Sequence, residues 1–472
     1  MVENIIYALP EIILLCGIFV LFIMNLFNSQ HRKTIKTCII FMLLSAFMEV
    51  IFYNKSFSIH YLNDTAFNTL SNMIVYISSF AVLILAKRWY ISENESPFIF
   101  CEALLSTLFF SNLLSASIHF AVTVIAYWGF IFINFLLLKH SHKLKENYTG
   151  LKNYKKAAYL FGSIMLLIAF VLYIENGHLA YSSLSPFVSI YLSPSEVSYL
   201  VFAIFICFAF LFGIAPLNFW RTEGLGQVIL PVLAYFLLVP VAAYFGALLN
   251  LSIKIFSSQF ASISNLTICF GTISLLIGAF GVCSGKNLYK LLAYGSLFHF
   301  GVILLSLSTI NVKSIDNFVL YLIIYSVTTY GLISALFGLK SRGDYLLMLP
   351  DIAGAADKKP YISAMITIYL FSLIGLPPFL GFIGLYAVGY GLALNNHLYV
   401  LLFLLMTDII ITYGYMQIVK NLYFEKSKNI FDTTEREIYT TIIITAIFMA
   451  ILIFNPDILI ENLQLLTENF ID

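Results

Sequence analysis

The chain has 472 residues, of which 61% are hydrophobic and 10% are charged, and its mean hydropathy is +0.93. Soluble domains carry about 25% charged residues, so this composition excludes an ordinary water-exposed surface. The 25 basic residues nearly balance the 24 acidic ones, which excludes the strongly basic face that a nucleic-acid partner requires. The six cysteines lie far apart, without the spacing of a disulfide framework or a metal motif. The sequence therefore predicts a polytopic membrane protein without a metal site.

Apolar windows of membrane-spanning length follow one another along the chain. They cover residues 5–27, 37–53, 70–86, 97–116, 118–138, 157–175, 197–217, 228–252, 266–285, 291–311, 318–339, 362–392, 397–419 and 439–457. Because lipid offers no hydrogen-bond partners to the backbone, each window is expected to close its hydrogen bonds internally as a helix. We therefore predict an all-α polytopic membrane protein with about fourteen transmembrane helices.

The basic residues are unevenly distributed among the loops. All of them except Lys55, Lys254 and Lys313 follow odd-numbered windows, and Arg221 belongs to the loop after the seventh window in this scheme. Cytoplasmic loops of membrane proteins carry an excess of Lys and Arg. The distribution therefore predicts that odd-numbered loops lie in the cytoplasm and that both termini lie on the opposite side.

Two windows contain helix-breaking residues at corresponding places. The seventh ends in a segment with Gly213 and Pro216, and the middle of the twelfth holds Gly375, Pro377 and Pro378. Proline removes a backbone donor and clashes with the preceding turn, so both helices should be broken. Paired breaks in two halves indicate an inverted-repeat transporter, and incidental proline is the alternative. The predicted organisation is N-terminal helices 1–3 in 1–96, a first inverted repeat in 97–252, a second in 266–419 and a C-terminal helix in 439–457.

Four segments resemble the antiporter-like membrane subunits of respiratory complex I. They are 9–15 (LPEIILL), 215–220 (APLNFW), 287–299 (NLYKLLAYGSLFH) and 371–382 (FSLIGLPPFLGF). The last two are specific to this family, and the first favours the subunit N branch of bacterial NADH-quinone oxidoreductase. The resemblance covers the chain from the first window to the last. It implies fourteen helices with two inverted five-helix repeats, proton translocation driven by quinone reduction elsewhere in the complex, and a place in the bacterial inner membrane with periplasmic termini.

The resemblance also implies ionisable residues that this chain lacks. The family's glutamate in helix 5, lysines in helices 7 and 8, basic residue after the second break and histidine in the 215–220 motif align with Tyr127, Leu211, Val241, Leu385 and Asn218. Leucine and valine do not titrate, so a lysine relay cannot operate at those positions. Only Lys290 and His299 keep the family's ionisable types.

Asp408 is the deepest charge, near the middle of the thirteenth window. A carboxylate at the centre of a bilayer costs about 2.5–3.5 kcal/mol on insertion scales, so it normally faces a polar interior. Thr412 and Tyr415 follow at i+4 and i+7 and share its helix face. Two interpretations stay open: a proton-transfer site, or a neutral aspartic acid that holds helices together through hydrogen bonds.

His299 shares a helix face with Ser296 and Ser306, and the next window offers Tyr321 and Tyr325 at matching spacing. Histidine is the side chain whose ordinary pKa lies nearest physiological pH, which suits a proton relay. The alternative is a histidine that only packs helices together.

Lys290 precedes His299 by nine residues, about 13 Å along a helix, so direct contact is not expected. It is either part of the relay or a cytoplasmic positive-inside anchor. Glu11, Glu49 and Glu102 lie one or two turns inside their windows, and we expect them at the membrane interface.

These observations predict a non-redox membrane-arm subunit of a proton-translocating NADH:quinone oxidoreductase, with no self-contained active site and no catalytic residue of its own. NADH, FMN, iron–sulfur clusters and quinone would be served by other subunits or by subunit interfaces. The expected partners are the other membrane and peripheral subunits and the lipid bilayer. One alternative is a non-pumping scaffold of the same complex. The other is a subunit of a multi-subunit cation/proton antiporter.

Overall fold

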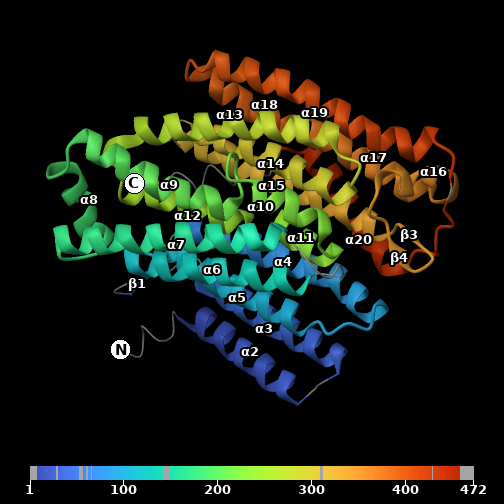
Figure 1. Cartoon of the computed structure of the whole chain (residues 1–472), viewed down its shortest axis with the longest axis horizontal. Helices are drawn as coiled ribbons and strands as arrows, with labels where there is room; N and C mark the ends of the chain where they lie inside the picture. Colours follow the sequence, from blue (N-terminus) through green and yellow to red (C-terminus); the bar gives the residue numbers. More distant parts are fainter. Residues whose placement is uncertain are drawn as a thin grey trace. The chain divides into compact units, whose positions relative to one another are not determined.

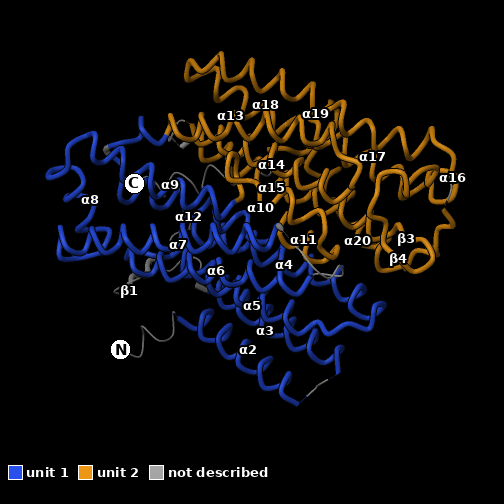
Figure 2. The backbone as a smooth tube through the Cα atoms, viewed as in Figure 1, with its two compact units in different colours: residues 1–212, 238–263, 469–472 blue, residues 213–237, 264–468 orange. Residues whose placement is uncertain are grey.

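The computed structural model describes residues 8–27, 30–52, 57–59, 62–64, 66–141, 149–308, 312–427 and 429–457, which are almost entirely helical (Figure 1). The chain forms two compact units (Figure 2). Unit 1 comprises residues 1–212, 238–263 and 469–472, and unit 2 comprises residues 213–237 and 264–468.

Unit 1 is built around helix α5. Helices α2, α3, α4, α6 and α12 all pack on it. Strands β1 and β2 form an antiparallel hairpin between α3 and α4. The elements of unit 1 are α2 (Leu9–Leu26), α3 (His31–Phe52), β1 (Phe57–Ile59), β2 (Leu62–Asp64), α4 (Ala66–Ser92), α5 (Phe98–Ala116), α6 (Phe120–His140), α7 (Thr149–Asn176), α8 (Tyr181–Ile190), α9 (Pro194–Phe212), α12 (Val241–Lys254) and η2 (Ser257–Gln259).

Unit 2 is built around helix α15, on which α14, α17, α18 and α20 pack. The elements that lie wholly or mostly in it are α10 (Phe219–Gly224), η1 (Leu225–Gln227), α11 (Leu230–Leu238), α13 (Phe260–Ser284), α14 (Leu288–Ser306), α15 (Val312–Phe337), β3 (Lys340–Ser341), β4 (Asp344–Tyr345), η3 (Leu349–Ile352), α16 (Ala355–Lys358), α17 (Pro360–Ile374), α18 (Leu380–Leu394), α19 (Leu398–Phe424) and α20 (Arg436–Phe454). Strands β3 and β4 form a short antiparallel hairpin.

The predicted number of membrane spans is confirmed. Among the described residues, 13 helical spans are long and apolar enough to cross a membrane. The twelfth predicted window is the remaining one, and it is divided between α17 and α18, which have 15 residues each. Neither half is long enough alone, because a span needs about 20 residues.

Both predicted helix breaks are present. Gly213 separates α9 from α10 with φ +65°, and Gly375 separates α17 from α18 with φ +76°. This left-handed conformation disfavours any residue with a Cβ atom. In each break a proline follows three residues later, at Pro216 and at Pro378, the latter preceded by Pro377. Glycine thus turns the backbone, and proline prevents the first helix from continuing.

The eighth span contains a third interruption that the sequence analysis does not predict. The window 228–252 was expected to be one helix, but the backbone leaves the helical path between α11 and α12, at Val239 and Pro240. Pro240 then precedes the first residue of α12 and occupies its N-cap position. A proline at this place lacks the N–H that a continuous helix would use. The high hydropathy of the window conceals this break.

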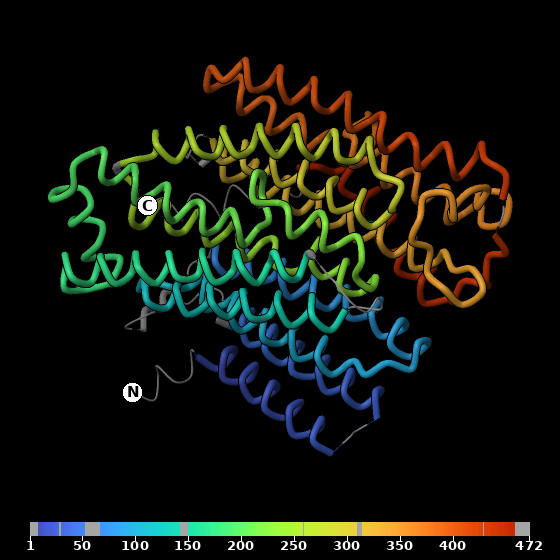
Figure 3. Tube along the Cα trace, viewed as in Figure 1, coloured from blue at the N-terminus to red at the C-terminus, as the bar shows by residue number. Residues whose placement is uncertain are grey.

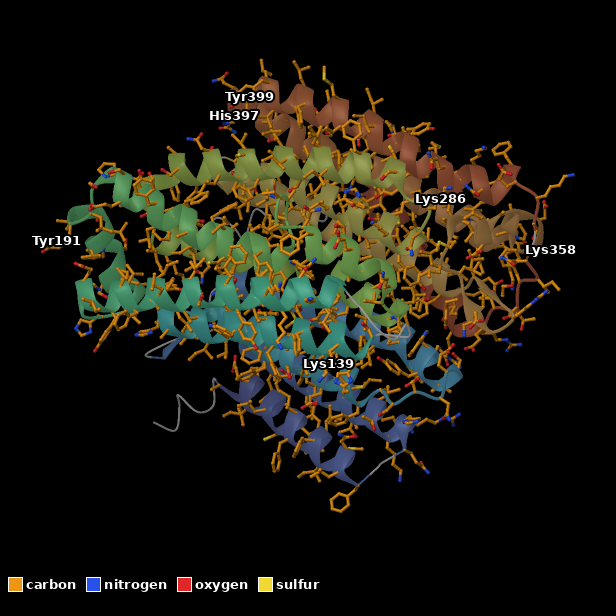
Figure 4. All side chains as sticks on the ribbon, viewed as in Figure 1. Lys139, Tyr191, Lys286, Lys358, His397 and Tyr399 are labelled. Atoms are coloured by element: carbon orange, nitrogen blue, oxygen red, sulfur yellow. The ribbon has the colours of Figure 1, made fainter. Side chains whose placement is uncertain are left out.

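The helices of each unit alternate in direction along the chain, which can be followed in Figure 3. Within unit 2, Lys286 and Lys358 lie toward one end of the helices, whereas His397 and Tyr399 lie toward the other (Figure 4). Within unit 1, Lys139 and Tyr191 are separated in the same way. In both units, residues from odd-numbered and even-numbered loops therefore lie at opposite ends, as the charge distribution requires.

The inverted repeats stay a prediction. Residues 213–237, which belong to the predicted first repeat, lie in the second compact unit. A repeat is a symmetry relation between two segments, and division into compact units does not test it.

The second break depends on a glycine that allows α17 and α18 to approach closely. A Cβ atom on Gly381 would lie 1.6 Å from the carbonyl oxygen of Ser372, and the Gly381 N–H donates to the Ser372 hydroxyl at 3.0 Å. We expect Gly381→Ala to destabilise the chain by at least the cost of overpacking, about 1–3 kcal/mol, because a backbone carbonyl must move. The melting temperature of the purified chain in detergent should therefore fall. Gly285→Ala is the control, since its nearest neighbour would be 3.6 Å away, and equal melting of the two variants would contradict this account.

Candidate functional site

His299 lies at the centre of unit 2. Its side chain is 2% exposed, on the buried helix α14. The Tyr321 hydroxyl, from α15, is 2.9 Å from Nδ1, and the Tyr415 hydroxyl, from α19, is 3.5 Å from Nε2. A neutral imidazole donates at one nitrogen and accepts at the other, and a phenol can do either. Three helices therefore place His299 between two groups that can exchange a proton with it.

A glycine makes room for Tyr415. A Cβ atom on Gly295, one turn before His299, would lie 2.2 Å from the Tyr415 hydroxyl. His299 thus meets α19 through Tyr415, while Tyr321 approaches from α15. Of the predicted proton-path residues, the structure brings His299 and Tyr415 together, and Ser296 lies one turn earlier on α14.

Arg221 is a buried cation that the sequence analysis places wrongly in a loop. Its side chain is 2% exposed, and it belongs to α10, the short helix after the first break. Its guanidinium donates to the Ser296 hydroxyl from Nε and Nη2, both at 3.2 Å, and to the Phe236 carbonyl at 2.8 Å. Its Cζ atom lies 4.5 Å from the centre of the Phe300 ring, a cation–π contact.

The reason for the wrong placement is local. The apolar window ends near residue 217, and six residues of α10 are too few to show helical periodicity. The position of Arg221 in the sequence could have indicated its burial. It is the first basic residue after a motif that breaks a helix at membrane depth. At that depth, backbone groups outside a continuous helix must form hydrogen bonds with protein or water. A broken helix therefore indicates a polar interior around it.

Tyr325 completes the group of residues around His299. Its hydroxyl donates to the Leu237 carbonyl at 2.9 Å, and its ring centre lies 5.4 Å from that of His299 and 5.9 Å from that of Phe300. We call Arg221, Ser296, His299, Tyr321, Tyr325 and Tyr415 the His299 cluster. In this cluster the permanent positive charge of Arg221 is bonded to Ser296, which lies one helix turn before the titratable imidazole of His299.

Asp408 lies beside this cluster on α19. Its carboxylate is close enough to act electrostatically on Tyr321 and Tyr415. Its buried Oδ1 atom has no hydrogen-bond partner among the described residues. The residue lines a cavity of about 370 Å³ between α18 and α19, which Gly375 and Leu385 also line. Asp408 is therefore poised between a cavity and the cluster.

Thr412 does not serve the carboxylate of Asp408. Its hydroxyl donates to the Asp408 backbone carbonyl at 2.7 Å, a bond within the helix. Lys290 is partly exposed in the first turn of α14, where Asn287 caps the helix by accepting from the Lys290 N–H at 2.9 Å. The Lys290 ammonium lies 6.0 Å from the Tyr294 ring centre. Neither the helix cap nor this ring contact joins Lys290 to the His299 cluster.

The family's relay positions in unit 1 are packed with apolar or aromatic groups. Tyr127 is fully buried, its hydroxyl donates to the Cys207 carbonyl at 2.9 Å, and its ring meets that of Phe208 edge-on at 5.8 Å. Leu211 and Val241 are likewise buried in the core. Leu211 and Val241 carry no ionisable group, and the Tyr127 hydroxyl is bonded to a backbone carbonyl. Within the described part of the chain, no group of three or more His, Cys, Asp or Glu side chains gathers as a metal site would require.

Comparisons with known proteins agree with this fold. A family model described as "NADH:quinone oxidoreductase/Mrp antiporter, TM" matches residues 122–412. The chain is 25% identical, over 96% of both chains, to NADH-quinone oxidoreductase subunit N of Beijerinckia indica subsp. indica. It is 24% identical to NADH-quinone oxidoreductase subunit N 1 of Rhizobium meliloti, over 94% of this chain and 93% of that one.

Solved structures share the fold over nearly the whole chain. A chain of respiratory complex I from Thermus thermophilus matches with a TM-score of 0.81 and 17% identity, covering 96% of this chain and 98% of that one. A chain of the Mrp complex from Dietzia sp. matches with a TM-score of 0.86 and 12% identity, covering 99% and 98%. Because the family model spans more than half of the sequence, the chain belongs to the NADH:quinone oxidoreductase/Mrp antiporter transmembrane family.

Proposed function

We propose that the chain is the N-type membrane-arm subunit of a proton-translocating NADH:quinone oxidoreductase in the bacterial inner membrane. Similarity to relatives named subunit N over almost the full length supports this assignment. Its partners are the other membrane and peripheral subunits and the surrounding lipid. It binds no redox cofactor itself, and NADH, FMN, iron–sulfur clusters and quinone are served elsewhere in the complex.

The single observation that carries a proton-transfer role is the burial of Arg221 and His299 at points one helix turn apart along α14. Arg221 is hydrogen-bonded to Ser296, and His299 is hydrogen-bonded to Tyr321. Arg221 keeps its charge at all accessible pH values, so it cannot be loaded and unloaded as a relay lysine is. His299 is the titratable member, and its two nitrogens face hydroxyls on different helices. Asp408 is the acid of the site, and its buried Oδ1 atom has no hydrogen-bond partner among the described residues.

The chemistry of the cluster follows from these positions. Among the described residues, Asp408 is the one acid in the lining of an otherwise mainly apolar and aromatic cavity, and it can give or take a proton there. Tyr415 and Tyr321 pass a proton to or from the imidazole, because each hydroxyl can donate and accept. The guanidinium of Arg221 raises the energy of an additional positive charge on His299, and ionisation of Asp408 lowers that energy. A charge movement elsewhere in the complex then shifts the proton between Asp408 and His299.

A non-pumping scaffold is the second candidate. The apolar packing of Tyr127, Leu211 and Val241 in unit 1 favours it, because the family's relay positions there carry no titratable acid or base near neutral pH. The antiporter alternative draws on the family model, whose description includes the Mrp antiporter, and on the fold shared with the Mrp chain, which is 12% identical. Neither favours it over the subunit N assignment. Proton counting separates the pumping and scaffold functions.

We expect Asp408→Asn and His299→Ala each to lower the number of protons translocated per electron pair while NADH oxidation and assembly persist. The first removes the acid beside the cavity, and the second removes the titratable base. The measurement is proton uptake by inverted membrane vesicles during NADH oxidation. Thr412→Val is the matched control, because the Thr412 hydroxyl donates to a backbone carbonyl within its own helix. Unchanged stoichiometry in both Asp408→Asn and His299→Ala would leave the scaffold function.

The proposed orientation has its own test. Alkaline phosphatase is active only outside the cytoplasm, so a fusion after Tyr191 in an even-numbered loop should be active. A fusion after Lys139 in an odd-numbered loop should be inactive. The opposite pattern would invert the topology and place both termini in the cytoplasm.

A further inference from the structure

Glu49 is a buried carboxyl group in unit 1, not an interfacial one as the sequence predicts. Its side chain is 3% exposed, three residues before the end of α3. Among the residues whose side chains the structure describes, it is the only carboxylate that the fold buries to this degree. Placing a carboxylate within a bilayer costs free energy, so such residues usually have a function.

Amide groups from two other helices hold this carboxyl group. The Asn72 side chain, on α4, donates to Oε1 at 2.8 Å, and the Asn112 side chain, on α5, lies 3.5 Å from Oε2. The same Asn112 nitrogen donates to the Tyr76 hydroxyl at 3.2 Å. Tyr76 also bonds to Ser45, and Glu11 on α2 is near enough to act on it electrostatically. Tyr76 and Glu11 are thus the titratable neighbours that these contacts identify.

The contacts suit both protonation states of Glu49. An amide donates to a carboxylate through its nitrogen, and after rotation by 180° it accepts from a carboxylic acid through its oxygen. The Asn112 oxygen is buried and has no hydrogen-bond partner among the described residues. Rotation would move the Asn112 nitrogen away from the Tyr76 hydroxyl, which could then donate to the Asn112 oxygen instead. Loss or gain of a proton at Glu49 therefore does not require the helices to separate.

A buried polar network continues from this group. Ser115 donates to the Asn72 oxygen at 2.8 Å, and Asn250 on α12 donates to the backbone carbonyl groups of Ser115 and Ser117, at 3.0 and 3.3 Å. The Ser117 hydroxyl lies 3.0 Å from that of Tyr181 at the start of α8. The network thus follows the ends of α3, α5 and α12 that adjoin even-numbered loops.

Glu49 lies close to the end of its helix. Three residues of helix separate Glu49 from Phe52, about 5 Å along the axis. Tyr127, which the family resemblance aligns with a glutamate, lies within α6, and its hydroxyl donates to the Cys207 carbonyl. Unit 1 therefore keeps a buried acid at a different place from the one that the family resemblance implies.

We propose that Glu49, with Asn72 and Asn112, forms a proton-binding site in unit 1 that exchanges its proton with the even-loop side of the membrane. Its use in proton translocation rests on the proposed function, whereas proton binding itself does not. The ligand is a proton held between a carboxyl oxygen and an amide, and no redox step is involved.

Infrared difference spectroscopy of the full chain in lipid nanodiscs tests this directly, because it needs neither turnover nor partner subunits. We expect a C=O stretching band of a protonated carboxylic acid that is present in acid buffer and disappears in alkaline buffer. Glu49→Gln should remove the component of this band that belongs to Glu49, while the components of the other carboxyl groups, Asp408 among them, remain. Glu102→Gln should retain the Glu49 component, since Glu102, on α5, is partly exposed and lies outside the network.

A second variant covers the case in which Glu49→Gln does not fold. Asn112→Leu keeps the acid but removes one hydrogen bond to it, so the band should move to higher frequency. A spectrum of Glu49→Gln with the same titrating band as the natural chain would overturn the proposal. So would a band that never titrates, or one abolished by sodium chloride but not by choline chloride at constant pH, which would indicate a sodium site.

Discussion

The break at Gly213 is the constraint on which the candidate site depends. A helix that stops at membrane depth leaves carbonyl groups and donors that lipid cannot satisfy, so the segment must turn into the protein. Here it turns into unit 2, where Ser274 accepts from the Ala215 N–H at 3.1 Å and α10 packs on α14. Arg221 lies in the interior because its helix, α10, packs on α14. The same segment that ends a helix therefore positions the buried cation.

A permanent charge changes what the rest of the site has to do. A relay lysine combines two properties, positive charge and exchangeable proton, whereas the guanidinium of Arg221 keeps only the first. The exchangeable proton falls to His299, three residues after the serine that binds the guanidinium. The acid falls to Asp408, which borders a cavity. In the proposed function, the roles of one relay lysine are thus divided among three side chains.

Sequence patterns predicted the helices and the two major breaks because hydropathy and proline act locally. They also indicated that Tyr321 and Tyr325 can meet His299, since helical spacing decides which side chains face one another. The burial of Arg221 and Glu49 was not predicted, because both lie near the ends of apolar windows. At such a place the sequence does not show whether a charged side chain faces water or protein. Only the packing of α14 against α10, and of α4 and α5 near α3, distinguishes the two cases. The interruption at Pro240 escaped because the surrounding residues are uniformly apolar.

The central claim is that the fixed charge of Arg221 replaces the missing relay lysines. The most direct test is the number of protons translocated per electron pair by the assembled complex carrying Arg221→Leu or Arg221→Lys, with the exposed Arg342→Leu as control. This account predicts that the leucine variant loses proton translocation to the extent that His299→Ala does, while the lysine variant retains most of it. Normal stoichiometry in an assembled Arg221→Leu complex would contradict the account.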